Sequence, residues 1–115
     1  MNIDPTNLTV YQNAMQQLRN LLNQSCDNAA GTDAANKLNG LANDVDGILT
    51  TLNQAGIAAN TAQLLAIQPN VAAVNTKIAA VQAQLNNLVK DIGLAGQIAG
   101  VMDKAVQLAG KVFVA

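Results

Sequence analysis

The sequence predicts an all-α fold, and two observations support this prediction. Apolar residues recur at alternating steps of three and four along most of the 115 residues, which is the spacing of one helix face. The apolar residues are also almost all aliphatic, because the chain contains one Tyr, one Phe and no Trp. A core of Ala, Leu, Val and Ile suits closely approaching helices better than sheets, whose surfaces are enriched in aromatic residues. We therefore expect residues 1–115 to form a single domain, an antiparallel four-helix bundle.

The first two helices are expected at residues 5–25 and 33–55. Asp4 is placed to cap the first helix, and Pro5 occupies its first helical position, where a missing N–H costs nothing. Between the two helices lies a turn region in which Gly31 is free to adopt a left-handed conformation. The apolar seams of the two helices consist of Leu8, Tyr11, Met15, Leu18 and Leu22, and of Ala34, Leu38, Leu41, Val45, Ile48 and Leu52.

Two glycines, Gly40 and Gly47, lie one heptad apart inside the second expected helix. Each costs roughly 1 kcal/mol relative to Ala in a helix interior. They are either tolerated defects or positions at which a neighbouring backbone approaches closely, and we prefer the close approach.

The second half of the chain carries a longer seam, between Val71 and Phe113. Its members are Val71, Val74, Ile78, Val81, Leu85, Leu88, Ile92, Ala95, Ala99, Met102, Val106, Ala109 and Phe113. One continuous helix along this seam would be about 65 Å long, roughly twice the length of either earlier helix. Its four glycines would together cost about 3–4 kcal/mol. We therefore expect a break near Gly93, with helices at 70–91 and 94–113.

The connection before this seam allows a further short helix at 60–67, which Pro69 would disturb at its end. The alternative to a four-helix bundle is an arrangement of three helices. It has one long, kinked C-terminal helix over residues 70–112, in an oligomer whose other copies cover the excess length.

The residue types that carry catalysis are scarce. No His and no Glu occur, so the commonest general base and metal ligand is absent. Cys26 has no imidazole partner to activate it, and Asp44 and Asp46 point away from each other on a helix. This Asp pair does not form an EF-hand calcium loop, because the first and twelfth loop positions would be Ala42 and Asn53. We therefore predict no catalytic, cofactor-binding or metal-binding residue, and no enzyme activity.

Charge is sparse along the whole chain, whose net charge is −1. The six basic residues form no cluster that could meet phosphates, so nucleic-acid binding is not expected. The polar faces carry 15 Asn and 11 Gln, and a low charge density gives little protection against association. We therefore expect a non-enzymatic helical structural or interaction protein, with a protein partner or a second copy of itself. The composition favours a bacterial protein that is secreted or surface-exposed, and the first residues do not resemble a Sec signal peptide.

The expected helix at 94–113 suggests an alternative function, because it is apolar around most of its circumference. That alternative is membrane association through this amphipathic helix. Asp103 and Lys104, near its centre, argue against a bilayer span, and its two Lys are few for a helix bound at a membrane surface.

Cys26 leaves two interpretations open: a half-buried small apolar residue, or an intermolecular disulfide in an oxidising compartment.

Overall fold

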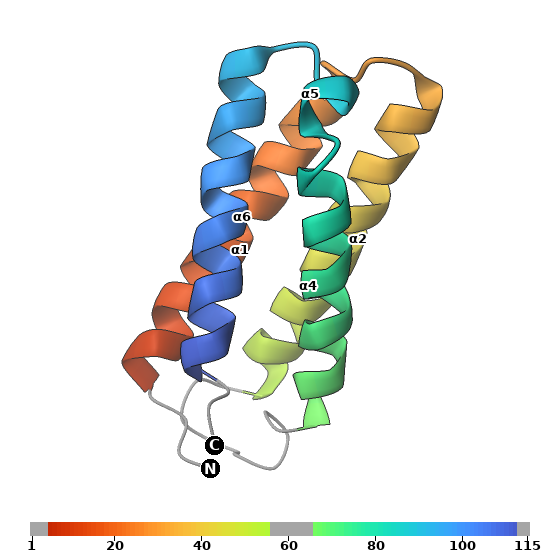
Figure 1. Cartoon of the computed structure of the whole chain (residues 1–115). Coiled ribbons are helices and arrows are strands. Elements are labelled where there is room, and N and C mark those ends of the chain that lie inside the picture. The colour runs from red at the N-terminus through yellow and green to blue at the C-terminus, as the bar shows by residue number, and fades with distance from the viewer. Residues whose placement is uncertain (1–4, 56–65, 113–115) are drawn as a thin grey trace.

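The computed structural model describes residues 5–55 and 66–112, and within these ranges the protein is all-α with no strand (Figure 1). The described residues form five helices: α1 Pro5–Cys26, α2 Thr32–Ala55, α4 Gln68–Gln82, α5 Leu85–Leu88 and α6 Ile92–Val112. The all-α prediction is thus confirmed. The expected N-cap Asp4, the seam residue Phe113 and most of the short helix allowed at 60–67 lie outside the described residues.

The four longer helices run side by side and alternate in direction. In Figure 1, α1 and α4 run upward, while α2 and α6 run downward. Helix α1 packs against α2 and α6, and α4 also packs against α2 and α6, although its contacts are much sparser than those of α1. The short α5 packs against α6 and α2. Helix α4 is therefore the most loosely held of the long helices.

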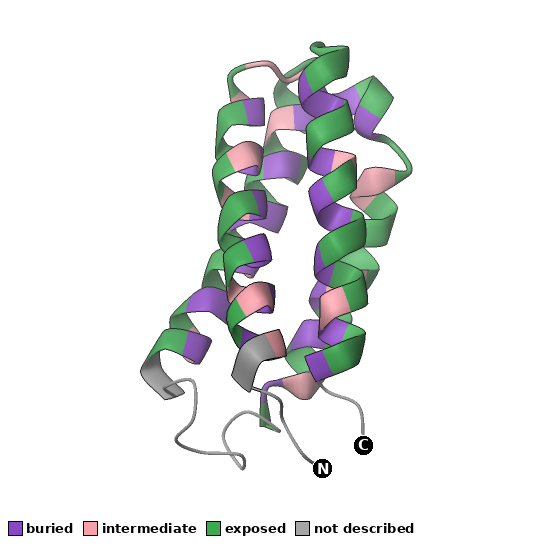
Figure 2. Ribbon diagram, turned by 90° about the vertical axis from the view of Figure 1, so that its left-hand side faces the viewer, coloured by how far each residue is buried: buried purple, intermediate pink, exposed green. Residues whose placement is uncertain are grey.

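The core is built from the inward faces of the helices, as Figure 2 shows. Every residue of the two seams expected in α1 and α2 is buried, so this part of the sequence pattern is confirmed. Tyr11, Met15 and Leu18 of α1 are completely buried, as are Leu38 and Val45 of α2. Because such side chains contribute about 1.5–3 kcal/mol each when they leave water, these two helices supply a large share of the stability of the core.

The break in the second half of the chain lies earlier than expected. Helix α4 ends at Gln82, α5 is a single turn, and the chain reverses direction at residues 89–91 before α6 begins at Ile92. Gly93 lies inside the first turn of α6, without a positive φ, so the prediction of a hinge at Gly93 was wrong by a few residues. The alternative of one long kinked helix over 70–112 is also wrong, because the chain turns back on itself.

A contact between two distant turns explains where this break lies. Ala29, between α1 and α2, forms an isolated antiparallel bridge with Val89, between α5 and α6. The Ala30 N–H donates to the Leu88 carbonyl oxygen at 2.8 Å, and the Lys90 N–H donates to the Asn28 carbonyl oxygen at 2.8 Å. Backbone N–H and carbonyl groups of each turn therefore find hydrogen-bond partners in the other turn. Because these groups are already paired, the chain can leave the helical conformation at this point.

Asp91 then starts α6, because its Oδ1 atom accepts hydrogen bonds from the backbone N–H groups of Gly93, at 2.9 Å, and Leu94, at 3.2 Å. Such a capping aspartate satisfies helix N–H groups that have no partner within the helix. The sequence contains this signal, since Asp91 directly precedes an apolar helical pattern, but Gly93 by itself favours a break two residues later.

The break also changes which residues of the long seam are buried. Ile92 is 80% exposed and Val106 is 38% exposed, so the seam is not continuous through α6. The buried face of α6 consists of Leu94, Ala95, Ile98, Val101, Met102, Ala105, Ala109 and Val112. A helix that starts anew after a turn sets its own rotation about its axis, and this one buries a stripe displaced from the expected seam.

The helical glycines do not mark close contacts between backbones. A Cβ atom added at Gly40, Gly47, Gly96 or Gly100 would meet no atom within 4 Å beyond its own helix. The expectation that a neighbouring backbone approaches Gly40 and Gly47 was therefore wrong, because these residues face open space. Gly31, in contrast, has a φ of 158°, which agrees with the expectation of a positive φ at this turn.

We expect the double substitution Gly96→Ala and Gly100→Ala to raise the free energy of unfolding by about 2 kcal/mol, since each glycine costs about 1 kcal/mol in an exposed helix. Gly31→Ala should have the opposite sign, because Ala is strained at a positive φ. Urea denaturation followed by circular dichroism measures both effects. A loss of stability in the double variant would show that another element covers this face of α6.

Candidate functional site

The aspartates of α2 are engaged with different neighbours. Asp44 pairs with Lys77 of α4, and the Asp46 Oδ1 atom lies 2.8 Å from Arg19 Nη1 of α1. The two carboxylates therefore point away from each other, as expected. In the part of the chain that the structure describes, no group of three or more His, Cys, Asp or Glu residues could hold a metal ion.

Cys26 is half-buried at the end of α1, where its Sγ atom lies 3.4 Å from the Leu22 carbonyl oxygen. Burial, and secondarily the charge of Asp27, raise the pKa of its thiol. Because the thiolate is the reactive form, a raised pKa makes Cys26 a weaker nucleophile than an ordinary exposed cysteine. The interpretation of Cys26 as a partly buried apolar residue agrees with this environment.

A groove runs along the contact between α2 and α4. It consists of two hollows, of about 330 Å³ and about 400 Å³, which share Asp44 and Lys77. The ion pair of these two residues crosses the groove at its middle. The half nearer the turns is lined by Gly40, Leu41, Ala80 and Val81, and the other half by Gly47, Ile48, Ala73 and Val74, with polar residues around both. These residues define the α2–α4 groove.

Small residues on both walls explain why this groove is open. Gly40 and Gly47 have no side chain to fill it, while Ala73 and Ala80 are exposed methyl groups on the opposite wall. Beneath them lie the buried side chains of larger residues such as Leu41, so the floor is apolar. The groove therefore offers apolar surface between two rows of small residues.

The polar contacts across the groove are weak and adjustable. The side chains of Lys77 and Asp44 are 60% and 36% exposed. At the end near the turns, Lys37 Nζ donates to Gln84 Oε1 at 3.3 Å. An exposed ion pair of this kind contributes about 0–1 kcal/mol, so an incoming group could rearrange it at little cost.

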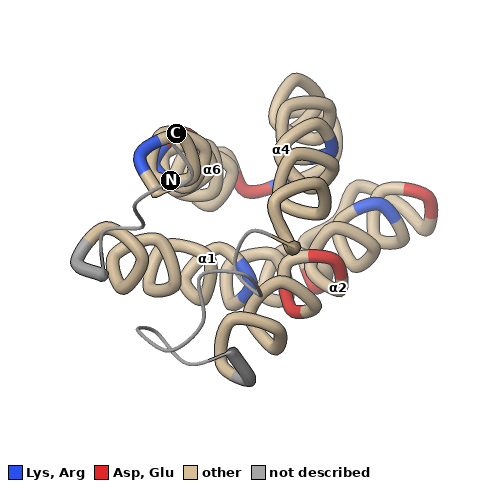
Figure 3. The backbone as a smooth tube through the Cα atoms, turned by 90° about the horizontal axis from the view of Figure 1, so that it is seen from below, with Lys and Arg blue, Asp and Glu red and all other residues tan. Residues whose placement is uncertain are grey.

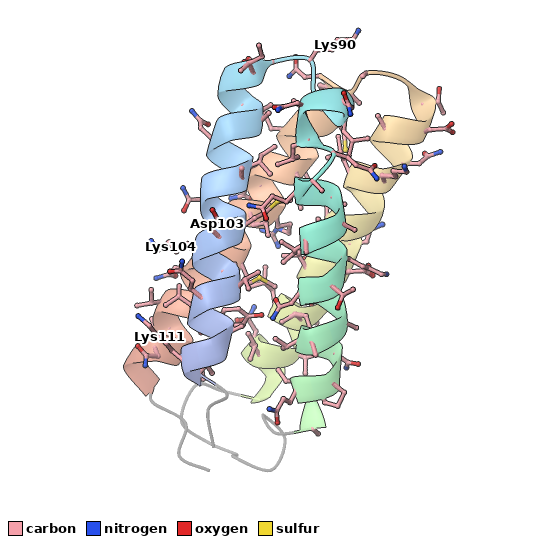
Figure 4. The ribbon with its side chains drawn as sticks, in the orientation of Figure 1. Lys90, Asp103, Lys104 and Lys111 are labelled. Atoms are coloured by element: carbon pink, nitrogen blue, oxygen red, sulfur yellow. The ribbon has the colours of Figure 1, made fainter. Side chains whose placement is uncertain are left out.

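The outer surface of α6 forms a second, more polar region. Lys104 and Lys111 lie on this helix together with Asp103, and Lys90 lies at the turn before it (Figure 4). The Asp103 carboxylate accepts a hydrogen bond from Gln82 Nε2 at 2.8 Å. Charged residues are dispersed over the helices, as Figure 3 shows, so the described residues present no concentrated charge.

The sequence reasoning missed the α2–α4 groove. The signal that could have found it was present: two glycines one heptad apart in α2, and two alanines one heptad apart in α4. Recognising it requires knowing that α4 lies beside α2, because neither helix by itself shows that its small residues face the other's.

No family model matches the chain, and no curated protein or solved structure matches it either. Of the helices described, none combines the length and the apolar character that crossing a membrane requires.

Proposed function

We propose that this chain is a non-enzymatic helical interaction protein, in which the four long helices form an antiparallel four-helix bundle that binds a helix in the α2–α4 groove. The observation that carries the proposal is the groove itself, a depression with an apolar floor and a polar rim that small residues leave open between two helices. Bound helices in other proteins lay an apolar face into such a groove.

The spacing of the groove suits a helix. Gly40 and Gly47 are seven residues apart, about 10 Å along α2, and Ala73 and Ala80 are equally spaced along α4. A helix lying in the groove presents side chains at positions i and i+7 with the same separation. In the bound helix, the side chains at i and i+7 each occupy one of the two hollows. The residues between them in the bound helix are small, so that they fit over the ion pair at the middle of the groove.

A selection experiment tests the proposal. Displayed amphipathic helical peptides are selected for binding to the full chain, and the best binder is measured against variants that fill the groove. Gly40→Leu and Gly47→Leu should each weaken binding by about tenfold or more, which corresponds to about 1.4 kcal/mol. Gly96→Leu is the matched control, because Gly96 is equally open but lies on α6.

Binding that is unchanged by Gly40→Leu and Gly47→Leu would show that the helix binds elsewhere, and the proposal would fail. A selection that yields no helical binder, with a chain that light scattering shows to be monomeric, would have the same consequence.

The alternative function, membrane association through α6, has less support. Most apolar residues of α6 are buried against the other helices, with Ile92 and Val106 as exposed exceptions, so extensive contact with lipid would require this helix to leave the core. Residues such as Ile98 and Met102, which are completely buried, would then lose their packing. Co-sedimentation of the full chain with vesicles of neutral and of anionic lipid tests this alternative, and we expect negligible binding to both.

A further inference from the structure

The two walls of the α2–α4 groove carry the same pattern of residues. On each wall a charged residue lies four positions after one small residue and three positions before another, and a larger aliphatic residue directly follows each small one. In chain order these residues are Gly40, Leu41, Asp44, Gly47 and Ile48 on α2, and Ala73, Val74, Lys77, Ala80 and Val81 on α4. The central residues of the two patterns, Asp44 and Lys77, have opposite charge, and Lys37 of α2 lies at the end of the groove near the turns.

The shared pattern gives the groove an approximate two-fold symmetry. Helices α2 and α4 run in opposite directions, and Asp44 of one meets Lys77 of the other. A rotation of 180° about an axis that passes through this ion pair, perpendicular to both helices, therefore exchanges the two walls within one copy. A helix that packs against the α2 wall needs small residues around one basic residue, and α4 is a helix of that kind within the chain itself.

The outer face of α4 is shaped to enter such a groove. Its exposed residues include Ala72, Ala73, Thr76, Ala79 and Ala80, and Lys77 is its one charged residue. Small side chains let two helices approach closely, because the distance between helix axes depends on the residues at the contact. Helix α4 also has the sparsest contacts of the long helices, so part of its surface is accessible to another helix.

A second copy can place its α4 in the groove while the first copy does the same in return. The required two-fold axis runs parallel to α4, between the two α4 helices, and the interface is isologous because each copy contributes the same surface. Each α4 then packs between α2 and α4 of the other copy.

The charges of the groove complement those of the second copy in this arrangement. The long Lys77 side chain of each copy can reach Asp44 of the other copy as well as its own, so the charges of Lys77 and Asp44 from the two copies sum to zero at the middle of the interface. The net charge of −1 per chain adds little repulsion between copies. A foreign helix would need a basic group at the same place to reach Asp44.

We propose that the helix bound in the α2–α4 groove is α4 of a second copy, in a two-fold symmetric homodimer in which Lys77 of each copy pairs with Asp44 of the other. This inference rests on the proposed function, since it assigns the occupant of the same groove.

Charge exchange at the interface tests the dimer. Light scattering of the full chain in reductant should give the mass of a dimer, which excludes a Cys26 disulfide as its cause. Asp44→Lys alone and Lys77→Asp alone each place four like charges at the interface, so each variant should dissociate with a dimer Kd raised about tenfold or more. An equimolar mixture of the two variants should form a heterodimer, because its charges are again opposite.

Asp46→Lys is the matched control, because Asp46 lies on the same helix but pairs with Arg19 outside the groove, and this variant should remain dimeric. A wild-type chain that is monomeric, a dimer that reductant abolishes, or single variants that stay dimeric would each overturn the proposal. A monomeric chain that still binds a selected helix in the groove would overturn the dimer alone and leave the proposed function intact.

Discussion

Leu85→Ala is expected to lower the free energy of unfolding by about 2–5 kcal/mol, because it removes a buried side chain and leaves a cavity. Leu85 begins α5 and is 3% exposed. The short helix packs against α6 and α2, so the cavity would open where three elements meet. Urea denaturation of wild type and variant, with the same slope in both, measures the difference.

Ile92→Ala is the matched control, because Ile92 lies one heptad after Leu85 in the same sequence seam but is 80% exposed. An exposed substitution of this kind should change stability by no more than about 0.5 kcal/mol. Equal losses at Leu85 and Ile92 would contradict the structure and favour the continuous seam. A loss below about 0.5 kcal/mol at Leu85 would show that α5 is not part of the core.

Tyr11 should make the protein sensitive to alkali. The side chain is completely buried, and this desolvation raises the pKa of its phenol well above the ordinary value. Above about pH 10 the unfolded chain loses the phenolic proton while the folded chain retains it. Stability due to this group is therefore fully present below about pH 10 and falls as pH rises, by roughly 1 kcal/mol or more per pH unit.

The difference between wild type and Tyr11→Phe isolates this effect, because both proteins share every other titrating group. Tyr11→Phe should lose less stability than wild type between about pH 10 and pH 12. The chain has one Tyr, so its tyrosinate absorption reports Tyr11 directly and should appear together with unfolding. Tyrosinate that forms in the folded protein near pH 10 would show that the side chain is accessible to water.

The sequence predicted α1 and α2 well because their signals are local. Each helix carries one unbroken apolar seam, and the turn between them contains Gly31. The apolar face of an amphipathic helix is buried by any helix that packs against it. The buried residues can therefore be predicted without knowing which helix is the neighbour. The same logic identified much of the buried surface of α4.

The second half was predicted less well because its decisive contact is not local. The bridge between Ala29 and Val89 joins two turns far apart in the sequence, and it places the break ahead of Gly93. Once α6 starts at Ile92, its rotation is set by packing against α1 and α4, and Ile92 and Val106 are left exposed. Periodicity alone does not reveal such a change of rotation.

The sequence by itself determined that this protein is all-α and where its first two helices lie, and it shows that the chain contains no His and no Glu. The tertiary structure decided where the long seam breaks and that Gly40 and Gly47 face an open groove rather than a neighbouring backbone. The physical reason is that helix formation and amphipathicity depend on residues within a few turns of one another. A turn contact or a groove depends on which helices become neighbours.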